Sequence, residues 1–391
     1  MRVATTYTAA LAAIAVLPRA LAIDVGSCVE FEAVDRKTET EVTITTADFQ
    51  CVSYTRLSIR SEMVLKSTVG AVTFSNLALK VYGSLTVEPD VTFTGITDVD
   101  HNGGALKLEL GAVGVFQGTA DFTDISIIPA DTGIRRFVKG AAIHSKGTLT
   151  FEKDATFSRC YNQQVSGESF NEAGEEVYHG SSGGGGAVYH HAKGTMHFMG
   201  KLTMTGNDAY VYFDAGRGEG GGIFNLGDVM VDGEANFTSN HGRDGGAIYQ
   251  ERWATFVFNS FATFQENVAW NQYGGALYNE GGDVAFLGGS LFDGNIAAST
   301  GDGGSGGALY NYDGGDMLLE GSTTFKNNFA NRAAGIFNVV ELPTFSDFEE
   351  DYGRKYRPAR ITFPEDTVFE DNDANFCADI AYSFDRDTCG L

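Results

Sequence analysis

The chain has 391 residues, of which 43% are hydrophobic, and its 51 acidic and 27 basic residues give a formal net charge of −24. This hydrophobic content is enough for a large core and excludes a disordered chain, while 50 glycines without a Gly-X-Y period and only 6 prolines exclude collagen. The acidic balance works against binding nucleic acid, and against binding acidic polysaccharide or anionic lipid without a bridging cation, because such ligands need clustered positive charge.

Residues 1–22 have the features of a secretory signal peptide. Arg2 supplies a positive charge, Ala9–Leu17 form a short apolar run, and residues 20–22 read Ala-Leu-Ala, a small-x-small cleavage site. An anchoring helix is the alternative, but the run is too short to span a bilayer and a Pro-Arg pair closes it. We therefore expect a secreted, extracellular or cell-surface protein whose mature chain begins at Ile23 and has no transmembrane segment.

Residues 23–77 precede the repeats described below and are predicted to form an N-terminal cap and the first coils. Secretion permits disulfides, and the economical pairing is local, Cys28 with Cys51 and Cys377 with Cys389. The alternative is that some of these are reduced, buried thiols. The local pairing would make 377–391 a disulfide-capped tail and leave Cys160 unpaired. No cysteine and histidine spacing of a zinc site occurs.

Two short motifs recur along residues 78–376. The first is a doublet of small residues followed by Ala or Gly, an aliphatic residue and usually an aromatic one; it begins at Gly103, Gly140, Gly185, Gly220, Gly245, Gly274, Gly306 and Ala333. The second is Phe-x-x-Asn, which ends at Asn240, Asn267, Asn295, Asn328 and Asn372, with a Met-x-x-Asn variant at Asn207 and copies with other last residues from Phe93, Phe122 and Phe157. Self-similarity at a period of 25 to 45 residues indicates a repeat architecture.

Between the two motifs runs a short segment in which apolar and polar residues alternate. Leu149 and Phe151 in one copy, and Val229 and Val231 in another, have the period-two pattern of a strand with one buried face. Helical periodicity is absent from the mature chain. A repeat of strands alone, with a period of about 25 residues, cannot bury its apolar face by itself, so successive turns of the chain are expected to stack.

The predicted fold is therefore all-β, a single parallel β-helix with an N-terminal cap. Its interior would hold columns of like residues, with Phe stacked along the core. The repeated Asn would adopt the left-handed conformation at a tight turn and bond the Asn above and below it, and the Gly doublets would allow a positive φ or close backbone approach. This interpretation makes Asn207, Asn240, Asn267, Asn295, Asn328 and Asn372 a structural ladder. Cys160 takes the same position in its copy and is predicted to be buried and unpaired.

The paired doublet and Phe-x-x-Asn motifs resemble the repeats of the chlamydial polymorphic outer membrane proteins, over residues 78–376. Those repeats belong to the wider class of right-handed parallel β-helix, pectin-lyase-like proteins, so the resemblance implies a right-handed coil. It also implies a surface-exposed adhesin. The motifs are specific for the type of repeat and much less specific for function.

Many β-helix proteins act on polysaccharides, so the alternative function is a divergent lyase, hydrolase or epimerase. Such enzymes need clustered carboxylates on one face, as an acid and base pair or to hold Ca²⁺. The sequence has no signature of galacturonan hydrolases or mannuronan epimerases. We predict no catalytic residue, metal or cofactor, and we favour a non-enzymatic protein that binds a glycan or an extracellular protein.

The lengths of the repeat indicate where a ligand would bind. In seven of eight copies the doublet precedes the next Phe or Met by 16 to 18 residues, whereas 4 to 24 residues separate the Asn position from the next doublet. An exposed turn tolerates insertions that a packed coil does not, so we expect binding at this variable corner. The candidate residues are Tyr212, Arg217, His241, Arg243, Asp244 and Trp270.

One sequon for N-glycosylation is present, at Asn236-Phe237-Thr238. If Phe237 points into the core, alternation along a strand turns Asn236 outward. Asn236 is therefore predicted to be accessible to modification.

Overall fold

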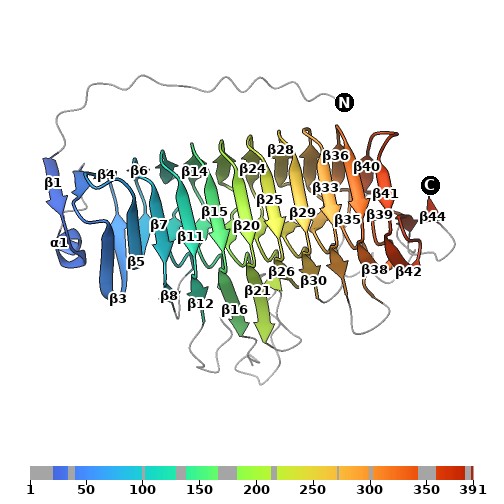
Figure 1. Cartoon of the computed structure of the whole chain (residues 1–391), viewed down its shortest axis with the longest axis horizontal. Coiled ribbons are helices and arrows are strands. Elements are labelled where there is room, and N and C mark those ends of the chain that lie inside the picture. Colours follow the sequence, from blue (N-terminus) through green and yellow to red (C-terminus); the bar gives the residue numbers. More distant parts are fainter. Residues whose placement is uncertain are drawn as a thin grey trace, which may run out of the picture.

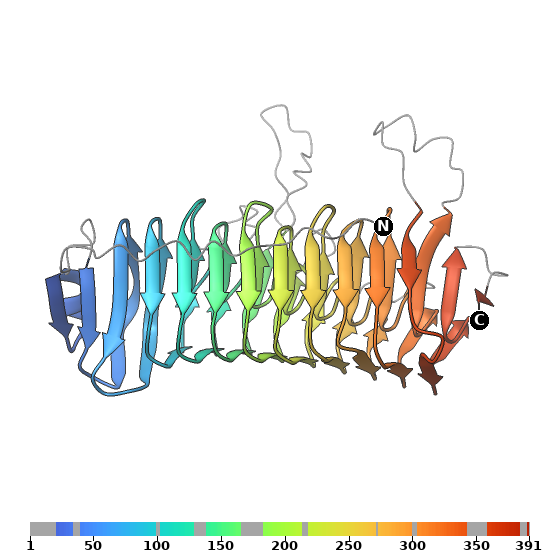
Figure 2. The ribbon, with the colours of Figure 1, turned by 90° about the horizontal axis from the view of Figure 1, so that it is seen from above.

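The strands of the computed structural model lie side by side along one long axis, in the order in which they occur in the sequence (Figures 1 and 2). The structure describes residues 21–33, 40–98, 102–128, 138–165, 183–212, 218–270, 273–298, 303–341, 358–383 and 389–390. Neighbouring strands pair in parallel, with an antiparallel exception near the C-terminus. The predicted all-β class and the stacking of parallel strands are confirmed.

The first sheet has twelve strands in the described part of the chain. They are β1 (Leu21–Val25), β2 (Thr40–Ile44), β4 (Glu62–Ser67), β6 (Ser84–Val87), β10 (Val113–Phe116), β14 (Thr148–Phe151), β19 (Thr195–Phe198), β24 (Asp228–Val231), β28 (Thr255–Phe258), β32 (Asp283–Phe286), β36 (Asp316–Leu319) and β40 (Arg360–Thr362). Leu149 and Phe151 of β14 are buried while Thr148 is exposed, so the alternating segments form strands with one face in the core, as predicted.

The second sheet contains two rows of strands. The Phe row carries the Phe of the second motif and consists of β3 (Asp48–Ile59), β5 (Val72–Val81), β7 (Val91–Thr94), β11 (Ala120–Thr123), β15 (Ala155–Ser158), β20 (Leu202–Thr205), β25 (Ala235–Thr238), β29 (Ala262–Gln265), β33 (Ser290–Asp293), β37 (Thr323–Lys326) and β41 (Val368–Glu370). The doublet row follows the small-residue doublets and consists of β9 (Leu106–Leu108), β13 (Ile143–Ser145), β18 (Val188–His190), β23 (Ile223–Asn225), β27 (Ile248–Gln250), β31 (Leu277–Glu280), β35 (Leu309–Tyr312), β39 (Ile336–Glu341), β43 (Ile380–Ser383) and the antiparallel β44 (Cys389–Gly390).

Strand β5 shows how the two rows are related. Its first half pairs with β7 and its second half with β9, so this single strand spans both rows. In the following coils the chain turns out of the second sheet after the strand of the Phe row, adds a strand to a third sheet, and re-enters the second sheet at the small-residue doublet. The third sheet is labelled along the lower side of the stack in Figure 1. Its described strands are β8 (Thr97–Asp98), β12 (Ser126–Ile127), β16 (Tyr161–Val165), β21 (Asp208–Tyr212), β26 (His241–Gly242), β30 (Val268–Ala269), β34 (Ile296–Ala297), β38 (Phe329–Arg332) and β42 (Asp373–Phe376).

The Gly doublets are required where the chain returns from the third sheet. Gly245 has a φ of 63°. A Cβ atom on Gly246 would lie 2.1 Å from the carbonyl oxygen of Gly275 and 2.6 Å from the backbone nitrogen of Val268. A side chain at either position would therefore strain the backbone or push neighbouring coils apart. Two short strands, β17 (Gly183–Gly184) and β22 (Gly218–Glu219), pair just before two of these doublets.

The Phe residues of the second motif stack in one column, as the sequence predicts. Ring centroids lie 4.7 Å apart for Phe237 and Phe264, 5.0 Å for Phe264 and Phe292, and 4.8 Å for Phe292 and Phe325. The rings are nearly parallel, since the angles between their planes are 2°, 12° and 5°. All four side chains are fully buried, so the column is the centre of the hydrophobic core.

The Asn side chains of the second motif form a ladder of hydrogen bonds along the stack. Asn267 Nδ2 donates to the carbonyl oxygen of Phe237 at 3.0 Å and to Asn295 Oδ1 at 2.9 Å. Asn267 Oδ1 accepts from the backbone nitrogen and from Nδ2 of Asn240, at 3.0 and 2.9 Å. The same pattern of bonds joins Asn207, Asn240, Asn267, Asn295, Asn328 and Asn372.

The expectation that the ladder Asn itself adopts the left-handed conformation is wrong. The residue before it does so: φ is 52° at Ser239, 53° at Glu266 and 54° at Asn327. The ladder side chain has to enter the stack, so the tight turn is made one residue earlier, where the side chain is at least partly exposed. A polar residue or Gly at that position tolerates a positive φ.

The N-terminal end of the stack carries a short helix, α1 (Cys28–Ala33), which the sequence analysis did not predict. Ser27 Oγ accepts a hydrogen bond from the backbone nitrogen of Glu30 at 3.3 Å, and Glu30 Oε2 accepts one from the backbone nitrogen of Gly26 at 2.7 Å. The bond from Gly26 lowers the pKa of Glu30. These reciprocal bonds cap the helix, which at six residues is too short to show a period in the sequence.

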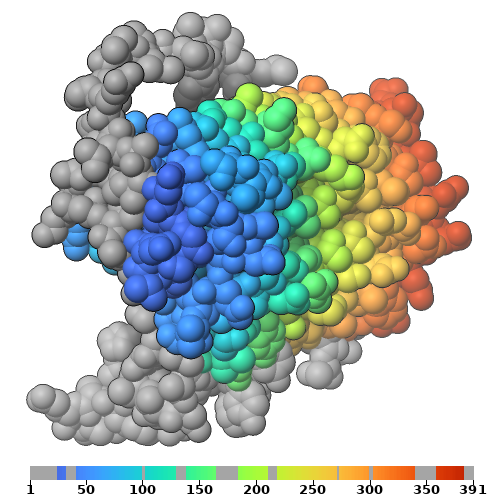
Figure 3. All heavy atoms as spheres, turned by 60° about the vertical axis from the view of Figure 1, so that its left-hand side comes forward, coloured from blue at the N-terminus to red at the C-terminus, as the bar shows by residue number. Residues whose placement is uncertain are grey.

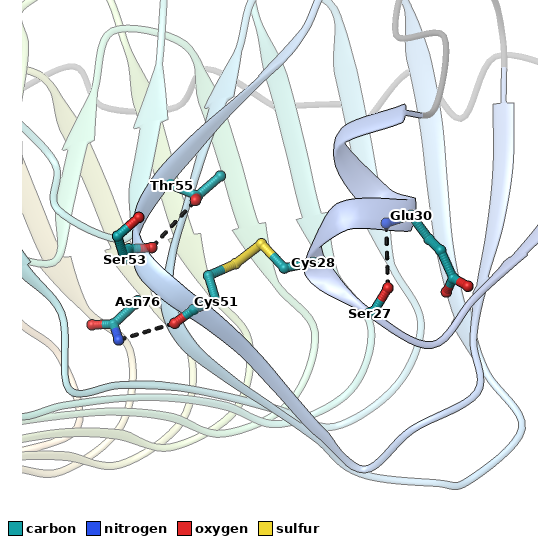
Figure 4. The surroundings of a disulfide bond; sticks show 7 residues. All are labelled: Ser27, Cys28, Glu30, Cys51, Ser53, Thr55 and Asn76. Atoms are coloured by element: carbon teal, nitrogen blue, oxygen red, sulfur yellow. Dashed lines mark hydrogen bonds between the residues drawn. A yellow bond between two sulfur atoms is a disulfide. The ribbon is translucent and has the colours of Figure 1, made fainter.

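The predicted disulfide between Cys28 and Cys51 is present and joins this helix to β3 (Figure 4). The ring of Phe31 packs edge-on against Phe49, with centroids 5.6 Å apart, and so closes the head of the Phe column. The first coils form one continuous face in the space-filling view (Figure 3). Strand β1 begins at Leu21, inside the predicted signal peptide.

The other cysteines differ in their surroundings. Cys377 is disulfide-bonded, and the side chain of its predicted partner Cys389 lies outside the described residues. Cys160 is free and fully buried, as predicted, and burial raises the pKa of its thiol to about 12. Its backbone nitrogen donates to Asn207 Oδ1 at 3.0 Å, so the ladder begins at this coil.

A second column and a second ladder, neither predicted, run along the doublet row. Neighbouring rings are stacked with centroids 4.8 to 5.2 Å apart in the column Tyr189, Phe224, Tyr249, Tyr278, Tyr310 and Phe337. The residue after each ring is polar and fully or almost fully buried; Asn279 Nδ2 donates to Asn311 Oδ1 at 2.9 Å, and Asn311 Nδ2 to Asn338 Oδ1 at 2.8 Å. His190 takes the corresponding position in β18.

Candidate functional site

The variable corner is the segment of each coil that connects the strand of the third sheet to the next small-residue doublet. Strands β16 and β21 are the longest pairing of this sheet, in register from Tyr161 and Asp208 to Val165 and Tyr212. The shorter β26 and β30 continue the sheet in the next two coils. Four of the six candidate residues lie on these two shorter coils, so the fold brings them to one edge of the stack.

His241 is the first residue of β26 and its side chain is exposed. It lies opposite Asp208 on one side and Val268 on the other. Burial raises the pKa of Asp208 to about 6, and the charge of His241 opposes that rise. A carboxyl group that titrates close to neutral pH therefore lies beside an exposed imidazole.

Arg243 and Asp244 follow on the same turn and are mostly buried. Arg243 Nε lies 3.9 Å from Asp244 Oδ2, and the backbone nitrogen of Arg243 donates to the carbonyl oxygen of Gly218. Asp244 Oδ1 accepts from the backbone nitrogen of Tyr273 at 3.1 Å, and its carbonyl oxygen accepts from Gly220 at 3.0 Å. Asp244 thus holds adjacent coils together, which makes it a positioning residue at this corner.

Trp270 is an exposed aromatic residue of the corner. Its side chain is 36% exposed, and its backbone nitrogen donates to the carbonyl oxygen of Gly242 at 3.0 Å. This bond places Trp270 on the coil next to His241 and Arg243. The second tryptophan of the chain, Trp253, is 77% exposed and lies on a different turn, between β27 and β28.

The remaining predicted positions are described in part. Tyr212 ends β21, but its side chain and the whole of Arg217 lie outside the described residues. Asn236 lies in β25 between Thr203 and Thr263, on the face opposite to that of Phe237, and is partly exposed. Its glycosylation stays a prediction.

Carboxylates were expected to cluster if the chain is an enzyme. Among the described residues, no group of three or more His, Cys, Asp and Glu side chains is placed to hold a metal ion. Asp283 and Asp316 are neighbours in register on the outer face of the first sheet, followed by Arg360. Burial and the neighbouring Asp316 raise the pKa of Asp283, as expected for two like charges on adjacent strands.

A network of ionic contacts joins strands of the doublet row to the turns that follow them, and it was not predicted. Arg252 Nη2 lies 3.0 Å from Glu280 Oε1 and 2.7 Å from Asp313 Oδ2, and the Tyr249 hydroxyl donates to Glu280 Oε2. These residues come from three successive coils and clamp them together. Arg252 and Asp313 fall in turns that vary from repeat to repeat, and Glu280 ends β31 just after the doublet motif, so no sequence motif indicates the network.

Comparison with known proteins gives no relative. No protein-family model, no curated protein and no solved structure matches the chain. The stacked parallel sheets agree with the β-helix class, but no comparison supports the chlamydial repeat family, and that resemblance stays a hypothesis. No helix in the described part of the chain is long and apolar enough to cross a membrane.

Proposed function

We propose that this chain is a secreted, right-handed parallel β-helix of the polymorphic outer membrane protein repeat type that binds a glycan or an extracellular protein at its variable corner. The observation that carries this proposal is the edge formed by His241, Arg243 and Trp270. It combines an exposed imidazole, a guanidinium and an exposed indole on two adjacent coils. Aromatic and arginine side chains of this kind supply much of the binding energy at known interfaces.

The rigid frame below this edge also supports a binding role. Asp244 bonds to the backbone of the coils on both sides, and the buried Asn ladder runs directly behind it. Because the frame is fixed by these bonds, the backbone that carries the ligand-binding side chains loses little conformational freedom when a ligand arrives. Insertions at the corner change the ligand-binding surface without disturbing the columns of the core.

A glycan array probed with the wild type and with the double variant Arg243→Ala and Trp270→Ala tests the proposal. The double variant should lose binding, while its stability stays within about 1 kcal/mol of the wild type, because the bonds from Asp244 that join the coils are kept. The matched control is Trp253→Ala, which removes an exposed indole from a different turn. If the double variant binds as well as Trp253→Ala does, the site is not at this corner.

The alternative function, a divergent polysaccharide-active enzyme, is favoured by one observation. Asp283, Asp316 and Arg360 follow one another across three coils on one face, which is where paired carboxylates act on sugar chains. Reducing-sugar and unsaturated-uronate assays on acidic polysaccharides test this function. Activity that Asp316→Asn abolishes would favour the enzyme, and its absence would favour the binding protein.

A further inference from the structure

Basic side chains gather on the outer face of the doublet row near its N-terminal end. Lys107, His144 and Tyr189 lie in one register column on β9, β13 and β18. The rings of His144 and Tyr189 are 5.4 Å apart. Lys139, which lies on the segment that enters the doublet, donates from Nζ to the Tyr189 hydroxyl at 3.1 Å, and its Nζ lies 4.6 Å from the centre of that ring.

Further cations surround this column. The pKa of His144 is lowered first by burial and then by the charges of Lys107, Lys146, Lys139 and His191. The pKa of His191 is lowered by burial and by Lys146, Lys139 and Lys193. We call Lys107, Lys139, His144, Lys146, His191 and Lys193 the basic cluster. It is a local excess of positive charge on a chain whose net charge is −24.

Little negative charge balances the lysines of the cluster. Carboxylates lie nearer its other end, since burial and then the charges of Glu251 and Glu219 raise the pKa of Tyr189. Glu109 lies 3.3 Å from Lys107, but it is shared with Lys80 at 3.1 Å. In the described part of the chain, no carboxylate makes an ion pair with Lys139, Lys146 or Lys193.

Polar groups inside the cluster also lack partners. His144 is only 2% exposed, and its Nδ1 has no hydrogen-bond partner among the described residues. The Nδ1 of His191 is likewise buried without a partner. Like charges held together and partly removed from water are unfavourable unless an opposite charge joins them. The arrangement is therefore that of an anion site rather than of a stabilising surface network.

We propose that the basic cluster binds a single oxyanion, that is, a carboxylate, sulfate or phosphate group. Lys139 Nζ and the Tyr189 hydroxyl would donate to the anion and Lys146 would neutralise it, through charge-assisted hydrogen bonds. His191 would donate as a neutral imidazole. The site extends from Lys107 to Tyr189, two interstrand spacings or about 10 Å. That length fits one anionic sugar or one free ion. The acidic remainder of the chain repels longer polyanions.

This proposal does not rest on the function proposed above, because the basic cluster and the variable corner share no residue. In the later coils, aromatic residues occupy the positions that correspond to Lys107 and His144, so these two basic side chains have no counterpart there. The two sites can therefore be tested separately in the full chain.

Isothermal titration calorimetry at constant ionic strength tests the proposal, with sodium sulfate, sodium phosphate, sodium glucuronate, sodium polygalacturonate and neutral glucose as probes. Sulfate and glucuronate should bind saturably at one site and glucose should not. Lys139→Gln and Lys146→Gln should each weaken binding by about tenfold, the loss of one charge-assisted hydrogen bond. The matched control is Lys153→Gln, an exposed lysine at another corner of the same coil, and it should bind as the wild type does.

The outcomes separate the sources of the anion. Binding of sulfate and phosphate without glucuronate would assign the site to a free inorganic ion, and binding of glucuronate would assign it to an acidic sugar. If Lys139→Gln fails to fold, Lys146→Gln carries the test, because its side chain is partly exposed. The proposal is overturned if no probe binds saturably, if Lys153→Gln weakens binding as much as the cluster variants do, or if polygalacturonate binds more tightly than glucuronate.

Discussion

Replacing Asn267 by Ala should remove one rung of the buried ladder and destabilise the coils around it. The substitution deletes four hydrogen bonds, from Asn267 Nδ2 to Phe237 O and Asn295 Oδ1, and from the two nitrogens of Asn240 to Asn267 Oδ1. Asn240 is fully buried, so its backbone N–H and one Nδ2 hydrogen would have no partner. Each unsatisfied buried donor costs about 1–3 kcal/mol, and we expect a loss of about 4 kcal/mol in the free energy of unfolding.

Equilibrium urea unfolding followed by circular dichroism measures this loss. The midpoint should fall at an unchanged slope, because the surface exposed on unfolding is nearly the same. Hydrogen exchange gives a local measurement, since the amide of Asn240, which donates to Asn267 Oδ1, should lose protection first. The matched control is Asn259→Ala, an exposed Asn bonded to Asp232 Oδ1 at 2.6 Å. If both variants shift the midpoint equally, the ladder does not hold the coils together as described.

Three further predictions follow from buried or outward-facing groups. Burial lowers the pKa of His190 to about 4, so the unfolded chain takes up the proton first, and the free energy of unfolding should fall by about 3 kcal/mol as the pH drops from about 6.5 to 4. In urea titrations, His190→Asn should abolish this loss. The difference between the wild type and the variant separates His190 from Asp208, whose raised pKa acts in the opposite direction. Cys160 should resist thiol reagents in the native protein and react after unfolding, and rapid native labelling would contradict its burial. Asn236 should carry glycan when a eukaryotic host secretes the chain, and mass spectrometry showing it wholly unmodified would count against its accessibility.

The Phe column and the Asn ladder could be predicted because each corresponds to a repeated letter of the sequence. Phe and Asn recur at fixed distances, and in a stack of parallel strands equal distance means equal position. The second ladder was missed because its position is occupied by different polar residues, Gln250 in one coil, Asn279 in another and His190 in a third. A column held by chemically similar but not identical side chains leaves a weaker pattern.

The basic cluster was missed for a related reason. Lys107 and His144 stand at the aromatic position of the doublet motif, and they depart from it in two neighbouring copies. Two adjacent copies that lack the aromatic residue of the motif indicate a local surface with another role, and this pattern in the sequence could have revealed the cluster. Lys139 and Lys146 lie on turns outside the motif, so only the fold shows that they face the same column.

The bonds between the Asn side chains of the ladder all point in the same direction along the stack, while the second hydrogen of each Nδ2 bonds to a Phe or Met carbonyl oxygen of the preceding coil. Each Nδ2 donates toward the C-terminal coils, from Asn207 to Asn372, so the amide dipoles add head to tail as peptide dipoles do in a helix. The positive end of this row would be left open at the last coil. There Asn372 Nδ2 donates to the carboxylate of Asp379 at 3.2 Å, so a negative charge caps the dipole where the coils end, as an acidic residue caps the first turn of a helix.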